Sequence, residues 1–143
     1  MNKLLFTRIG YTYLPTKNID ESITWYTKNL GLKLINKFED RGSNIAVLHY
    51  PHVNAIALLL IETRDYNPLY IVRNGSKFPV MAMNCTDIEY THKVLKDNKV
   101  EVSDIRTLGE QEAKYFYFKD NEGNLLEAAW SIWDPLDEFK EDF

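Results

Sequence analysis

The sequence lacks several features that mark large classes of proteins. Its 143 residues include one cysteine, Cys85, so no disulfide can form within the chain and a multi-cysteine zinc site is excluded. The longest apolar run, residues 55–61, is far shorter than the ~20 residues that span a bilayer. We therefore expect no membrane partner and, from the cysteine usage, a cytoplasmic location.

Positive charge is also scarce. The 17 Lys and Arg residues are outnumbered by 21 Asp and Glu residues, which gives a formal net charge of −4. Nucleic-acid-binding proteins usually carry a basic stripe that neutralises phosphates, so we expect no nucleic-acid partner. The six glycines form neither a P-loop nor a dinucleotide-binding fingerprint. No spacing of residues indicates a nucleophilic triad, and we assign no catalytic residue.

A well-marked helix follows a Tyr- and Thr-rich strand predicted at residues 9–14. Asn18 is the expected N-cap, and Glu21 stands three residues later, as in a capping box. Gly31 stands where a helix C-cap glycine belongs. Between them, apolar residues recur at helical spacing and form one stripe: Ile19, Ile23, Tyr26 and Leu30. The pattern predicts an amphipathic helix with one buried face.

The remaining pattern occurs twice. Strands are predicted at 32–38, 45–50 and 55–61 after the first helix. A second copy begins with a strand at 78–84 and a helix capped by Thr86, followed by strands at 100–102, 115–118 and 124–130. Each copy reads βαβββ, and Ile19 corresponds to Ile88.

The repeat predicts an α+β fold of two βαβββ modules related by a pseudo-twofold axis. We expect the first module over residues 1–63, a linker over 64–77, the second module over 78–130 and an acidic C-terminal tail over 131–143. The helices would cover one side of the strands and leave the other side as a concave surface.

Three segments, in this order, resemble the vicinal oxygen chelate superfamily, which includes glyoxalase I, bleomycin-resistance proteins and extradiol dioxygenases. The first is Leu14–Tyr26 followed by Asn29–Leu32, the second is Cys85–Glu89, and the third is Phe118–Glu127. The third is similar to the family's Phe-x-Asp-Pro-x-Gly-Asn-x-x-Glu hairpin, with Asn121 at the usual proline. The resemblance implies paired βαβββ modules and, commonly, a homodimer.

The resemblance also implies where family enzymes bind one divalent metal. The matching positions here are Tyr11, Val80, one residue within 57–61, and Glu127. Glu127 is the only ligand type retained, since Tyr11 has an ordinary pKa of about 10 and Val80 cannot coordinate. A catalytic metal needs about three protein ligands, so we expect none here.

Two other interpretations remain open. If the alignment slips by one residue, Glu62 takes the third position, and the chain could be a metal-dependent lyase, isomerase or ring-cleaving dioxygenase using Zn, Ni, Mn or Fe. Alternatively, the tail at 131–143 could make the chain an interaction module that docks on a partner or on its dimer mate.

Aromatic residues give the positive indication of function. They make up 13% of the chain, with nine Tyr. Strand alternation predicts a concave ligand pocket lined by Tyr11, Tyr13, Phe78, Val80, Leu125 and Glu127. Such a lining suits a small apolar or aromatic molecule, and the negative net charge favours a cationic one. The alternative is that these aromatics simply fill a core. We therefore expect a metal-free small-molecule-binding protein that sequesters or senses its ligand.

Overall fold

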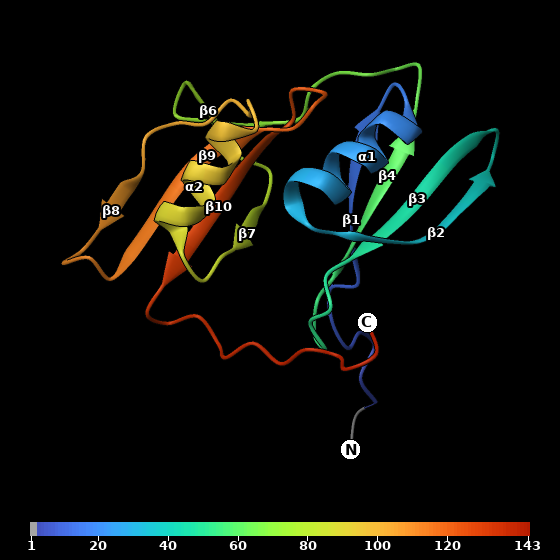
Figure 1. Cartoon of the computed structure of the whole chain (residues 1–143). Coiled ribbons are helices and arrows are strands. Elements are labelled where there is room, and N and C mark those ends of the chain that lie inside the picture. The colour runs from blue at the N-terminus through green and yellow to red at the C-terminus, as the bar shows by residue number, and fades with distance from the viewer. Residues whose placement is uncertain (1–2) are drawn as a thin grey trace.

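The computed structural model describes residues 3–143 and contains two similar modules side by side (Figure 1). The first module contains one helix and a four-stranded sheet in the order β1-β4-β3-β2, with β1 and β4 parallel. Its elements are β1 (Tyr11–Thr16), α1 (Ile19–Leu30), β2 (Lys33–Asp40), β3 (Ser43–His49) and β4 (Ala57–Glu62).

The second module repeats this arrangement. Its sheet has the order β7-β10-β9-β8, again with the first and last strands parallel and adjacent. Its elements are β7 (Ala82–Asn84), α2 (Ile88–Asp97), β8 (Arg106–Leu108), β9 (Ala113–Lys119) and β10 (Leu125–Ser131). The predicted α+β fold class is confirmed, and the two matching sheet orders are consistent with pseudo-twofold modules. No helix among residues 3–143 is long and apolar enough to cross a membrane.

The first helix forms as its sequence predicts. The Asn18 side chain accepts a hydrogen bond from the Glu21 amide, and Gly31 ends the helix at a φ of 72°, in the left-handed region that favours glycine. Ile19 and Tyr26 are fully buried, so the predicted apolar stripe faces the core. Each helix lies in front of the sheet of its own module in Figure 1, which leaves one face of each sheet free of helix.

The segment predicted as a linker contains a hairpin. Strands β5 (Ile71–Arg73) and β6 (Ser76–Phe78) pair across Asn74-Gly75, both of which have positive φ. Asn-Gly suits such a two-residue turn because both residues tolerate the left-handed region. The strand predicted over 78–84 is therefore wrong: β6 ends at Phe78, and β7 begins only at Ala82, beyond Pro79.

Two local predictions in the second module are also wrong. The cap of α2 is Asp87 rather than Thr86, because the Asp87 carboxylate accepts a hydrogen bond from the Tyr90 amide. The expected strand at 100–102 is reduced to one bridge between Val102 and Phe118. The Tyr117 amide donates to the Ser103 hydroxyl, which interrupts the backbone ladder, and β8 forms further along the chain.

A buried hydrogen-bond cluster joins the modules. The Asp120 carboxylate, at the β9–β10 turn, accepts four hydrogen bonds: from the amides of Glu122 and Asn124 at 2.9 Å, from Asn124 Nδ2 at 2.8 Å, and from the Tyr26 hydroxyl of α1 at 2.5 Å. Asn124 is fully buried, and its side-chain oxygen accepts from the Leu69 amide at 2.8 Å. This cluster fixes the turn, the linker and the first helix against one another.

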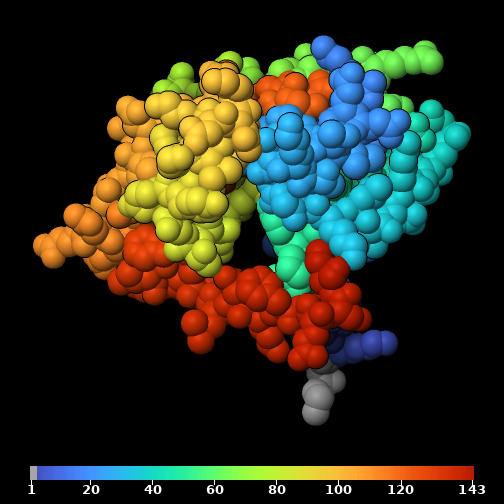
Figure 2. Space-filling model, viewed as in Figure 1, coloured from blue at the N-terminus to red at the C-terminus, as the bar shows by residue number. Residues whose placement is uncertain are grey.

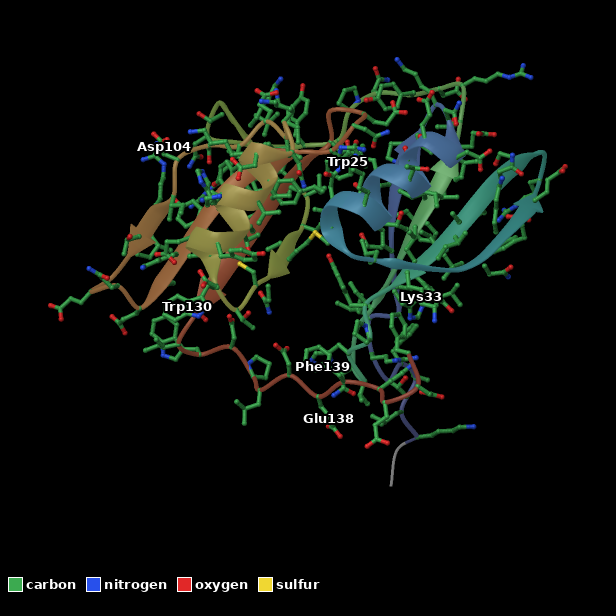
Figure 3. The ribbon with its side chains drawn as sticks, in the orientation of Figure 1. Trp25, Lys33, Asp104, Trp130, Glu138 and Phe139 are labelled. Carbon is green, nitrogen blue, oxygen red and sulfur yellow. The ribbon has the colours of Figure 1, made fainter. Side chains whose placement is uncertain are left out.

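The C-terminal tail crosses back from the second module to the first (Figures 1 and 2). The Val53 amide donates to the Glu138 carbonyl at 2.8 Å, and the Lys140 amide donates to the Pro51 carbonyl at 2.7 Å. His52 pairs with Asp137 at 3.3 Å and meets the ring of Phe139 edge-on. Figure 3 shows Trp130 near the start of this path and Glu138 and Phe139 beneath the first module. The tail thus docks on its own chain.

We predict that Tyr26→Phe lowers the free energy of unfolding by about 1–3 kcal/mol, because it removes one buried hydrogen bond to a carboxylate. Urea denaturation measures this loss. Tyr90→Phe is the matched control, since Tyr90 is 65% exposed on α2. A Tyr26→Phe protein as stable as the control would contradict the role of the cluster.

Candidate functional site

The helix-free face of the first sheet is lined by tyrosines above an apolar floor. Tyr11 and Tyr13 of β1 lie beside Ala57 and Leu59 of β4, and they are 60% and 55% exposed. Leu14 and Leu60, which alternate with them, are buried toward the helix. The floor is one apolar cluster of Ile45, Val47, Ala57, Leu59 and Ile61.

The corresponding face of the second sheet carries Glu127. In the β9–β10 pair, Glu127 lies directly opposite Tyr117, and Leu125 lies one step further along the same face. Ala82 of β7 flanks Glu127 on the other side, and the Val80 amide donates to the Leu125 carbonyl at 3.1 Å. Paired residues on adjacent strands point to the same face, so Tyr117 and Ala82 flank the Glu127 carboxylate on its two sides.

An aromatic row runs beside Glu127. The rings of Tyr115 and Tyr117 lie 5.6 Å apart between centroids, and Phe78 meets Tyr117 edge-on at 6.0 Å. Phe78 arrives from the β5–β6 hairpin, whereas the tyrosines belong to β9. We call Phe78, Tyr115 and Tyr117 the aromatic row. Tyr115 and Tyr117 are inclined at 36° to each other, so a flat apolar molecule can stack on them, and Phe78 stands beside them at 75° to Tyr117.

A hollow of about 230 Å³ adjoins this row. Tyr117, Lys119 and Leu125 line it from β9 and β10, and the Glu101–Ser103 segment forms its rim. Lys119 is paired there with Glu101 at 3.4 Å. The hollow is therefore walled by aliphatic, aromatic and charged groups.

Electrostatics single out Glu127 and Tyr117. Partial burial raises the pKa of the Glu127 carboxyl above its ordinary value, because the charged form loses hydration. Burial also raises the pKa of the Tyr117 phenol, and the nearby Tyr115 and Glu127 add to this effect. The carboxylate thus lies in a partly dehydrated, aromatic environment.

The structure divides the predicted pocket residues between the two sheets. Phe78 meets Tyr117 of the aromatic row, and Leu125 lies on the same face as Glu127 opposite that row. Val80 bonds Leu125 through its backbone, but its side chain packs against the main core. Tyr11 and Tyr13 lie on the other sheet. Tyr115 and Tyr117 are not among the predicted pocket residues, although the short turn between the last two predicted strands indicates an antiparallel hairpin. Antiparallel pairing across that turn places Tyr117 opposite Glu127.

The residues at the metal positions do not fit a divalent ion. Tyr11 and Glu127 offer one phenol and one carboxylate, and they lie on different sheets. Val80 has no metal-coordinating atom in its side chain. The same is true of the β4 residues on the helix-free face, Ala57, Leu59 and Ile61. Within residues 3–143, no three His, Cys, Asp or Glu side chains are grouped closely enough to hold a metal. This donor set falls short of the three or more ligands that catalytic sites supply.

Glu62 serves a structural purpose. Its carboxylate accepts hydrogen bonds from the Ile19 amide at 2.9 Å and from Asn44 Nδ2 at 3.1 Å. The first contact satisfies a free amide at the start of α1 and places negative charge at the positive end of the helix dipole. Glu62 therefore lies on the helix side of the sheet, away from Tyr11.

Comparison with known proteins agrees with this architecture. Residues 8–128 match the family model of the Glyoxalase/Bleomycin resistance protein/Dioxygenase superfamily, and the chain belongs to this family. No curated protein sequence matches the chain significantly.

Solved structures show the same fold at low sequence identity. A glyoxalase/bleomycin resistance protein/dioxygenase domain from Frankia sp. EAN1pec superposes with a TM-score of 0.70 at 15% identity, over 88% of this chain and 98% of that one. TnmS3, an antibiotic-binding protein from Streptomyces sp. CB03234, gives 0.70 at 12% identity, over 90% and 99%. The trypanothione-dependent glyoxalase I of Leishmania major gives 0.66 at 17% identity, over 86% of each chain. One fold therefore accommodates a binding protein and an enzyme.

We predict that Glu127→Gln raises the melting temperature above about pH 6 and leaves it unchanged below about pH 4. The raised pKa means that the folded state holds this proton more tightly than the unfolded state, so the wild-type protein loses stability as pH rises through that range. Thermal melts across this range measure the difference. The exposed Glu110→Gln is the control, and an equal response in both variants would disprove the burial effect.

Proposed function

We propose that the protein binds a small apolar or aromatic molecule on the concave face of its second module, and sequesters or senses it without a catalytic metal. The observation that carries the proposal is the aromatic row beside Glu127, set next to a hollow of about 230 Å³. Similarity in fold to an antibiotic-binding protein supports this class of function.

A metal-dependent lyase, isomerase or dioxygenase is the alternative, supported by similarity in fold to a glyoxalase I. The donor set argues against it, because apolar side chains stand at Val80 and at the β4 position. Binding of a small apolar molecule requires only a complementary shape and apolar contacts, and the helix-free face of the second sheet offers such contacts.

Two further properties belong to this proposal. A homodimer is supported by the exposed apolar residues at the first sheet, Ile9, Tyr11, Tyr13 and Phe38, which are 40–76% exposed. Exposed apolar patches often mark protein interfaces. A cytoplasmic location is supported by the single cysteine, which is free.

The ligand proposal predicts that the neutral aromatic probe 1-naphthamide binds the wild-type protein and that Tyr117→Leu weakens this binding about tenfold. Fluorescence titration measures the affinity. Tyr90→Leu, which removes an exposed tyrosine from α2, should leave the affinity unchanged.

Elemental analysis of tag-free protein after dialysis against Mn²⁺, Fe²⁺, Co²⁺, Ni²⁺ and Zn²⁺ should find far less than one equivalent of metal. About one equivalent, lost in Glu127→Ala, would establish the enzyme alternative.

The dimer proposal predicts that the wild-type protein sediments as a dimer and that Tyr13→Lys converts it to a monomer, since a charge would be buried in an apolar interface. Analytical ultracentrifugation measures the masses, with Tyr90→Lys as the control. A wild-type monomer at micromolar concentration would refute the dimer and leave the ligand proposal intact.

A further inference from the structure

Two arginines stand at the ends of the aromatic row. Arg106 of β8 lies directly opposite Tyr115 of β9, so the two side chains share one face. Arg73 of the β5–β6 hairpin places its guanidinium carbon 5.0 Å from the ring centroid of Phe78. The row is therefore flanked by a cation at each end.

These cations have no acidic partners among residues 3–143. The ion pairs described there include neither Arg73 nor Arg106, whereas Lys119 is already paired with Glu101. Both guanidinium groups are close enough to Tyr117 to lower the pKa of its phenol, opposing the effect of burial. Two unpaired positive charges thus act on the row and oppose the effect of the Glu127 carboxylate on Tyr117.

Glu127 does not offset both of them. It supplies one carboxylate on this face, and its partial burial disfavours the charged form. The chain as a whole carries −4, but charges on distant surfaces are screened over about 8 Å in physiological salt. Local charge therefore decides which ligands the face attracts.

We infer that the ligand is a planar aromatic molecule that carries an anionic group, such as a carboxylate, sulfonate or phosphate. Its ring stacks on the aromatic row, and its anionic group is bound by Arg73 or Arg106. The planar guanidinium group of arginine can donate two parallel hydrogen bonds to such an anion. The inference rests on the proposed function and specifies its ligand class. A cationic ligand would be repelled by Arg106 at one end of the row and by Arg73 at the other.

Three naphthalene probes of equal ring size and different charge test the inference: 1-naphthoate, 1-naphthamide and 1-naphthylmethylammonium. We expect wild-type protein at pH 7 to bind naphthoate about tenfold more tightly than naphthamide, and the ammonium most weakly. Arg73→Gln and Arg106→Gln should each weaken naphthoate binding about threefold to tenfold, and the double variant should lose the preference. Titration followed by tyrosine fluorescence gives all the affinities.

Controls separate charge recognition from folding. Naphthamide affinity should stay constant in both arginine variants, which shows that the stacking surface is intact. Arg41→Gln removes a cation from the β2–β3 turn of the other module and should change none of the affinities.

The outcomes distinguish the two proposals. If naphthamide binds but naphthoate binds no better, or the ammonium binds best, the anionic ligand class is overturned and the aromatic binding site stands. If none of the probes binds the wild-type protein at about millimolar concentration, the proposed function itself fails. A naphthoate preference that survives in the double arginine variant would also overturn the assignment of Arg73 and Arg106.

Discussion

The buried carboxylate of Asp120 is the interaction on which the arrangement of the molecule depends. Within residues 3–143 it has no lysine or arginine partner, and four hydrogen bonds satisfy it, from the backbone amides of Glu122 and Asn124, from the Asn124 side chain and from Tyr26. A buried charge is tolerated only when such bonds replace its hydration. Asn124 extends the cluster to the linker through the Leu69 amide. One turn of the second module thereby orients the helix of the first.

The same cluster explains part of the hairpin motif. Asp120 and Asn124 are structural residues, and Gly123 adopts a φ of 86°, which a residue with a side chain rarely accepts. Asn121, at the position where proline is usual, donates from Nδ2 to the Ser22 hydroxyl of α1 at 3.0 Å. The departure from the family pattern thus adds a contact between the modules. Leu125 and Glu127, at the end of the motif, lie on the helix-free face of the second sheet.

The helix-free faces carry mostly apolar side chains at the positions where the family resemblance places metal ligands. Where the family places metal ligands, the chain has Val80 and the apolar floor of β4, and Glu62 is engaged at the start of α1. The fold is retained because its core lies on the opposite side of each sheet, where Leu14, Leu60 and Leu126 are buried. Strand alternation allows the two faces to change independently, so binding can replace catalysis without loss of the fold.

The sequence by itself determined the elements whose signals are local. Asn18, Gly31 and the stripe through Ile19 and Tyr26 specify α1, and strand alternation assigns Tyr11, Leu125 and Glu127 to the helix-free faces. Weaker local signals fail: the sequence predicts a cap at Thr86, whereas Asp87 provides it, and it predicts a linker where the short strands of the hairpin around Asn74-Gly75 form. Three-residue strands carry too few residues for a period to be visible.

Only the tertiary structure decided which side chains accompany Glu127. Tyr117 is opposite it through strand register, Phe78 reaches the row from a hairpin nearly 40 residues earlier in the chain, and Arg73 and Arg106 flank the row from two separate strands. The tail also folds back onto the first module through backbone bonds near Pro51 and Val53. Such neighbours are determined by packing and backbone pairing between segments that are distant in the chain. Periodicity and capping signals depend only on residues close together in the chain, so they do not predict these contacts.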